Sequence, residues 1–144
     1  MHPTTTELFA ETIEKTGHWL DELMPVTGKA EPRRAYSVLR AVLHVLRDRL
    51  TAEEAVDLGT QLPMLVRGFY YEGWRPAGRP AKHRHKAEFL ELVAESYPSL
   101  AAAEREPAVR AVFKLLSHHI TAGEIKHVRD QLPAEVRSLW DTPA

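Results

Sequence analysis

Cations and aromatic rings alternate in the segment from Arg67 to Lys86, which gives this part of the chain the clearest potential for chemistry. The segment holds six arginine and lysine residues and a single acid, Glu72, in a chain whose net charge is -1 at pH 7. Aromatic rings can stack on bases while neighbouring cations contact phosphates. The segment therefore predicts a surface for a phosphate-bearing anion, a nucleotide or a nucleic acid. Its candidate binding residues are Arg67, Tyr71, Trp74, Arg75, Arg79, Lys82 and Arg84.

A structural role is the main alternative for the same segment. Phe69 and Tyr70 correspond to Leu139 and Trp140 near the end of the chain, so both are expected in the core. Trp74 and the nearby prolines could fix a rigid linker. Neither of the usual glycine-rich phosphate loops occurs, so nucleotide hydrolysis is not expected.

Three histidines, His118, His119 and His127, form a second group with potential chemistry, since they could bind a metal ion if Glu124 or Asp130 lay beside them. Adjacent residues of a helix point about 100° apart, so His118 and His119 cannot both face one ion. The paired Glu-x-x-His motifs of di-iron bundles are absent. We therefore expect a solvated helix face here, with no metal ion and no other cofactor.

Catalytic groups are not expected in this sequence. The chain has no cysteine, which excludes thiolate catalysis and disulfide bonds. No serine, histidine and acid share a spacing that would support a catalytic triad. The acid pair Glu53-Glu54 is interpreted as solvent-facing residues at a helix cap. The sequence thus predicts a protein that is not an enzyme.

An internal repeat positions these residues, with a second copy 70 residues downstream of the first. Arg40-Ala41-Val42 recurs as Arg110-Ala111-Val112, and Gln61-Leu62-Pro63 recurs as Gln131-Leu132-Pro133. Apolar residues three or four positions apart precede each Gln-Leu-Pro element, which is the spacing of a helix with one buried face. Each copy is therefore expected to consist of amphipathic helices.

The start of the first copy follows a different register. Phe9 and Ile13 match Phe89 and Val93 at an offset of 80 residues. We therefore expect Phe9 and Ile13 on the core side of a first helix, followed by about ten extra residues, roughly 19 to 32, before the second helix.

Helix ends are marked twice in the same way. Thr51 and Thr121 are N-cap candidates with a glutamate three positions later, Glu54 or Glu124, which predicts two capping boxes. The proline of each Gln-Leu-Pro element suits the first turn of a following helix, so it predicts a corner between two helices.

Paired arginines recur at equivalent positions, Arg67 with Arg137 and Arg40 with Arg110. The favoured interpretation is that they bond to carbonyl groups of the corners or to the capping carboxylates. The alternative is that two arginines converge across a pseudo-two-fold axis on one anion.

These patterns predict an all-α fold, because no segment alternates like a strand. We expect a compact bundle of about eight helices built from two copies of a four-helix unit with pseudo-two-fold packing. Residues 1–144 would form a single helical domain, with the internal repeat at 4–70 and 86–140 and the connector at 71–85.

The run from Arg40 to Leu50, followed by Thr51–Ala55, Gln61-Leu-Pro63 and Tyr70-Tyr-Glu-Gly-Trp74, resembles a bacterial family known as domain of unknown function 2267. The resemblance covers the chain from about Leu8 to Trp140, and its most specific part is Gln-Leu-Pro leading into Tyr-Tyr-Glu-Gly-Trp. It implies an all-helical, duplicated, cytosolic domain, and it carries no activity and no site residues.

The remaining expectations concern location and partners. No stretch has the roughly 18 apolar residues of a membrane span, and the first residues lack the pattern of a signal peptide, so a cytoplasmic protein without membrane contact is expected. The leading functional hypothesis is a non-enzymatic interaction or scaffold domain that binds an unknown protein partner or itself. The alternative is binding of a phosphate-bearing anion, nucleotide or nucleic acid through residues 67–86.

Overall fold

Eight α-helices make up the part of the chain that the structure, a computed structural model, describes, residues 2–76 and 80–141. No strand occurs among these residues, which confirms the all-α prediction. A short π-helical turn, Met24–Gly28, follows the first helix, and a 3-10 turn, Ser138–Trp140, follows the last. The helices are α1 (Thr5–Leu23), α2 (Pro32–Arg49), α3 (Ala52–Thr60), α4 (Met64–Tyr71), α5 (Lys86–Ser96), α6 (Ala102–His119), α7 (Ala122–Asp130) and α8 (Ala134–Arg137).

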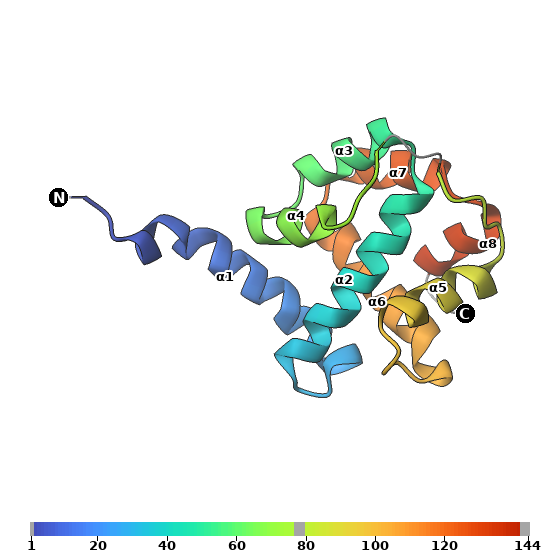
Figure 1. Cartoon of the computed structure of the whole chain (residues 1–144), viewed down its shortest axis with the longest axis horizontal. Helices are drawn as coiled ribbons and strands as arrows, with labels where there is room; N and C mark the ends of the chain where they lie inside the picture. Colours follow the sequence, from blue (N-terminus) through green and yellow to red (C-terminus); the bar gives the residue numbers. More distant parts are fainter. Residues whose placement is uncertain (1, 77–79, 142–144) are drawn as a thin grey trace.

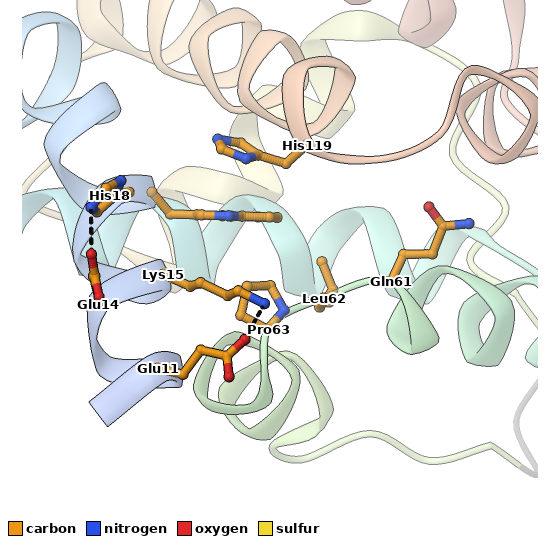
Figure 2. A pocket seen from close by; sticks show the side chains of 9 residues that line it. Glu11, Glu14, Lys15, His18, Gln61, Leu62, Pro63 and His119 are labelled. Carbon is orange, nitrogen blue, oxygen red and sulfur yellow. Dashed lines mark ion pairs between the residues drawn. The ribbon is translucent and has the colours of Figure 1, made fainter. Parts of the chain in front are cut away.

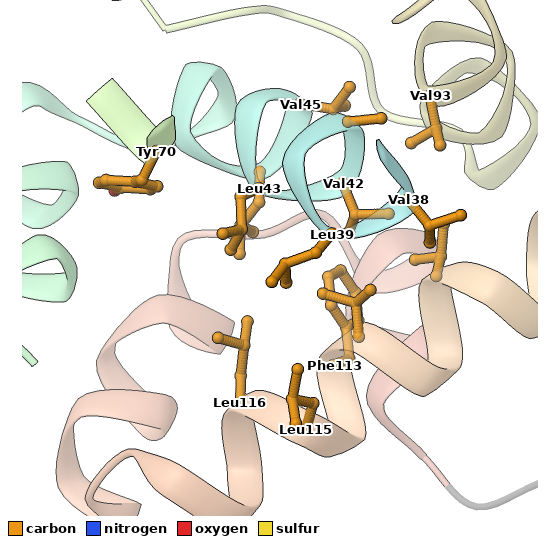
Figure 3. Packing of buried hydrophobic residues seen from close by; sticks show 14 of the residues in the cluster. Val38, Leu39, Val42, Leu43, Val45, Tyr70, Val93, Phe113, Leu115 and Leu116 are labelled. Atoms are coloured by element: carbon orange, nitrogen blue, oxygen red, sulfur yellow. The ribbon is translucent and has the colours of Figure 1, made fainter. Parts of the chain in front are cut away.

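Helices α2 and α6 lie at the centre of the bundle, and the shorter helices pack around them (Figure 1). Their apolar stripes face each other, so that Leu39 and Leu43 of α2 approach Phe113 and Leu116 of α6 (Figure 3). All four side chains are fully buried. Burial of apolar area is the main source of stability in such a bundle, since helices of this length are marginal by themselves.

The threonine caps are present as predicted, but the glutamates that complete a capping box are not. The Oγ1 atoms of Thr51 and Thr121 accept hydrogen bonds from the backbone N–H groups three residues later at 3.2 and 3.3 Å. The N–H of Thr51 donates to Oε1 of Gln131, and that of Thr121 donates to Oε1 of Gln61, both at 3.0 Å. Each glutamine therefore replaces the expected glutamate, although it comes from the other half of the chain.

This replacement overturns two predictions about the glutamates. Glu54 and Glu124 do not bond back to their own caps, and both are buried instead of facing solvent. The physical reason is that the cap N–H groups already have an acceptor, so the carboxylates turn inward.

The proline corners and their arginines follow the favoured interpretation. Arg67 donates from Nε to the carbonyl of Gly59 at 2.9 Å and from Nη2 to that of Leu62 at 3.0 Å. Arg137 makes the equivalent bonds to Arg129 and Leu132 at 3.0 and 2.9 Å. These arginines bind the last carbonyls of the helices before each corner, and not the glutamates.

Helix α1 departs from the expected register. Its N-terminal half projects away from the other helices (Figure 1). Phe9 and Ile13 remain 43% and 52% exposed, so the prediction that they face the core is wrong.

The buried positions of α1 lie further along the helix. Trp19 and Leu23 are buried, and they precede the fully buried Phe89 and Val93 of α5 by 70 residues, the offset found elsewhere in the chain. Because Trp19 to Leu23 form the last turns of α1, no extra segment begins at residue 19. The expected insertion is therefore wrong.

Among the described residues, no helix combines the length and the apolar composition needed to cross a membrane.

Candidate functional site

The connector between α4 and α5 is docked on the C-terminal end of α2. Arg47 donates to the carbonyls of Tyr70 and Glu72 at 2.7 and 2.9 Å, and Arg49 donates to that of His83 at 2.9 Å. His83 itself is buried. Bonds of this kind hold the connector against the bundle, as a structural role requires.

Two of the aromatic candidates in this segment have structural contacts. Tyr71 packs between Tyr70 and Trp74, with ring centroids 4.9 and 5.3 Å away. A Cβ atom at Gly59 would collide with the Tyr71 hydroxyl, so this close approach requires glycine. Tyr71 and Trp74 are only partly accessible, and they pack against the core.

The candidate cations do not share one place with these rings. Arg67 is engaged at its corner, as described above, whereas Arg75, Lys82 and Arg84 are exposed. Arg79 lies outside the described residues. Trp74 and Arg75 line one cavity, and Arg84 lines a different one.

Arg84 lies close to a second arginine. Burial, together with the nearby charge of Arg84, lowers the pKa of Arg49. Acids surround this pair, since Glu88 accepts from the backbone N–H of Arg84 and Glu135 pairs with His85 at 2.8 Å. Binding of a phosphate-bearing anion at the connector stays a prediction.

The adjacent histidines of α6 have a partner that their sequence did not suggest. His118 and His119 contact the two carboxylate oxygens of Glu22 in α1, at 3.1 and 2.8 Å. The ring of His119 also stacks on Trp19, with centroids 4.9 Å apart. The pair therefore anchors the C-terminal half of α1 to the bundle.

An exposed apolar surface lies on the other half of α1 and is the best candidate site. Leu8 is 63% exposed and belongs, with Phe9 and Ile13, to the apolar stripe that continues into the buried part of the helix. Met64 and Leu65 at the start of α4 are also exposed. We call these five residues the α1 face.

Helix α4 is fixed beside the α1 face by one cross-helix hydrogen bond. The N–H of Leu65 donates to Oγ1 of Thr12 at 3.3 Å. The capping box at Thr4, in which Thr4 and Glu7 exchange hydrogen bonds at 3.2 and 3.3 Å, keeps the projecting half helical. The surface is thus presented on regular helices.

A groove runs between α1 and the α3–α4 corner, next to the α1 face (Figure 2). Its larger cavity is about 500 Å³, and Trp19, Leu62 and Pro63 supply its apolar lining. A second cavity of about 290 Å³ continues the groove to Leu8 and Met64. An apolar groove beside exposed apolar residues is a typical docking place for an amphipathic helix.

Ion pairs line the same groove. Lys15 pairs with Glu11 at 2.9 Å, and His18 lies 3.9 Å from Glu14 (Figure 2). These pairs are exposed and add little stability, but they set the charge that a partner meets.

A family model described as "Uncharacterized conserved protein (DUF2267)" matches residues 16–139. The chain belongs to this family. A comparison with curated proteins finds no match to the sequence. The family match confirms the resemblance drawn from the sequence, and it carries no activity.

The DUF2267 match begins inside α1, so Leu8, Phe9 and Ile13 precede the matched residues. Sequence reasoning missed the α1 face because these residues have the spacing of a core stripe. One signal could have found it: the unbroken offset of 70 residues aligns positions 5–15 with connector residues 75–85, which contain no helix that could pack in the same way.

Proposed function

We propose that this DUF2267 domain is a non-enzymatic interaction domain whose α1 face binds an amphipathic helix of a protein partner. The observation that carries the proposal is the exposure of Leu8, Phe9 and Ile13 on a helix whose apolar stripe is buried further along. An exposed apolar surface next to a groove is typical of interaction sites.

The energy available at this surface is sufficient for specific binding. Full burial of a leucine, isoleucine or phenylalanine side chain contributes about 1.5–3 kcal/mol. Leu8, Phe9 and Ile13 retain about half of their area, as do Met64 and Leu65. Covering all five would thus contribute roughly 5 kcal/mol or more before the costs of association.

The charge of α1 favours a basic partner over a second copy of the chain. Its projecting half carries Glu7, Glu11 and Glu14 against a single lysine, Lys15. Pairing α1 with another α1 would bring two acidic helices together, and like charges oppose association. The partner helix is therefore expected to carry lysine or arginine next to its apolar residues.

We also infer that the two halves of the bundle are related by an approximate two-fold axis. Two reciprocal hydrogen bonds support this, since the N–H of Thr51 reaches Gln131 and that of Thr121 reaches Gln61. Helices α2 and α6, like α3 and α7, also start 70 residues apart and have equal lengths. The projecting half of α1 is then the main departure from symmetry.

A labelled single-cysteine variant tests the proposed binding, because the chain has no native cysteine. An environment-sensitive dye on I13C would report binding of a synthetic amphipathic helix with leucines on one side and lysines beside them. We expect saturable binding that a peptide with glutamates in place of the lysines does not reproduce.

The control compares two charge insertions at exposed apolar positions. Phe9→Glu, with the dye still at position 13, is expected to weaken binding by about tenfold or more, a loss of roughly 1.4 kcal/mol. Val56→Glu on α3 places the same charge away from the α1 face and should leave binding unchanged. Equal binding by both variants would refute the proposal, and a dimer that Phe9→Glu dissociates would identify a second copy as the occupant.

A further inference from the structure

Two buried carboxylates face the contact between α3 and α7. Glu54 and Glu124 occupy the third position of these helices, and their side chains are only 7% and 8% exposed. The Oε1 atom of each is buried without a hydrogen-bond partner among the described residues. Buried polar atoms in native proteins almost always have a partner, so two unpaired oxygens at one place require an explanation.

The glutamine exchange explains why both carboxylates point inward. Gln131 and Gln61 bond to the cap N–H groups that the glutamates of a capping box would normally accept from. Glu54 and Glu124 thus have no local donor, and each adds a like charge to the surroundings of the other. Such a pair is unfavourable unless a proton or a cation lies between the carboxylates.

An imidazole completes the cluster. His127 lies one turn after Glu124 on α7, with its Nδ1 atom 4.0 Å from Oε2 of that glutamate. One ligand atom from each of Glu54, Glu124 and His127 lies within 4.8 Å of the other two. The side chain of His127 is 65% exposed, which leaves an entry path from solvent to the buried oxygens.

We propose that Glu54, Glu124 and His127 bind one divalent transition-metal ion, which joins α3 to α7. Two carboxylates with an imidazole suit zinc, manganese or iron(II) better than magnesium or calcium, which prefer oxygen ligands alone. Ligand atoms around a zinc ion lie roughly 3–3.5 Å apart. Small rotations of these three side chains are enough to reach that spacing.

The first half of the chain supplies a fourth candidate ligand. Asp57 follows Glu54 by three residues, as His127 follows Glu124, so the two helices present Glu-x-x-Asp and Glu-x-x-His. Its negative charge acts on Glu124. Asp57 or water would complete the coordination, and the metal would fasten the two halves without taking part in the α1 face.

Metal titration of the full chain, free of purification tag and treated with chelator, tests the site. Zinc is the calorimetric probe, and cobalt(II) is the spectroscopic one because its visible absorption reports coordination. We expect one zinc ion per chain, a higher unfolding temperature with zinc, and little effect of magnesium.

Three variants assign the ligands. Glu124→Gln and His127→Asn are each expected to weaken zinc binding by at least about tenfold, since even outer-shell changes cause such losses. His127 is exposed, so its variant should fold normally even if the glutamate variant does not. The control is the double variant His118→Asn/His119→Asn, which removes the other histidine cluster and should retain the site.

Several results would overturn the proposal. These are no saturable zinc binding, zinc binding that both Glu124→Gln and His127→Asn retain, or binding that the His118/His119 control abolishes. Failure to bind zinc together with normal binding at the α1 face would leave a shared proton as the explanation of the carboxylate pair.

Discussion

Replacing Glu124 by glutamine should make the metal-free protein more stable at pH 8 and remove part of its pH dependence. Burial, together with the charge of Glu54, raises the pKa of Glu124 from 4.5 to about 8. The groups that face Glu124 are Glu54, Asp57 and His127. Both acids oppose its ionisation.

The sign of the effect follows from proton binding. The unfolded chain loses this proton near pH 4.5, whereas the folded protein keeps it until about pH 8. Between these pH values the folded state binds more protons, so the free energy of unfolding falls as the pH rises. Each pKa unit corresponds to about 1.4 kcal/mol, so the loss from pH 5 to pH 8 is about 3 kcal/mol.

Urea unfolding at a series of pH values, with chelator present, measures this loss. The informative quantity is the difference in unfolding free energy between wild type and Glu124→Gln, because the other titrating groups cancel in it. Glu53→Gln is the matched control, since Glu53 is an exposed carboxylate on α3. The reasoning fails if the wild-type and Glu124→Gln curves stay parallel from pH 5 to pH 8.

Three further substitutions test the packing, each by chemical denaturation. Leu43→Ala removes a fully buried side chain between α2 and α6 and should cost about 2–5 kcal/mol, whereas a loss below 1 kcal/mol would contradict the described core. Gly59→Ala should destabilise the protein because its Cβ meets the Tyr71 hydroxyl, and Tyr71→Phe should relieve the defect. Gln131→Ala leaves the N–H of Thr51 without its acceptor and should cost about 1 kcal/mol, with no change from Gln131→Glu as the contrary outcome to look for in the acceptor argument.

The helices of the central bundle could be predicted because their signals are local. Apolar residues three or four positions apart defined α2 and α6, and the threonine caps and prolines marked the ends of the shorter helices. The arginines of the corners were predictable for the same reason, since Arg67 reaches carbonyls only five to eight residues away.

The register of α1 could not be predicted from its own spacing. Phe9 and Ile13 fit the stripe of an amphipathic helix as well as Trp19 and Leu23 do, so periodicity does not decide which pair is buried. The outcome depends on where α1 meets the rest of the bundle, which includes the contact of Glu22 with His118 and His119 nearly 100 residues later. Such long-range contacts leave no local pattern.

The carboxylate pair was missed for a related reason. A glutamate three residues after a threonine predicts a capping box wherever no competing acceptor is near. The competitor of Glu54 is Gln131, which lies in the other half of the chain. A residue that is a surface cap by its local pattern thus becomes a buried group through a partner 77 residues away.

The glutamine exchange also bears on how the chain can fold. Helix α3 is completed by a residue of the second half and α7 by a residue of the first, so neither half can saturate its own backbone donors. A half alone would need a second half in solution to supply the missing glutamine. The connector converts that encounter into an intramolecular one at high effective concentration, so the two halves are expected to form cooperatively, as a single unit.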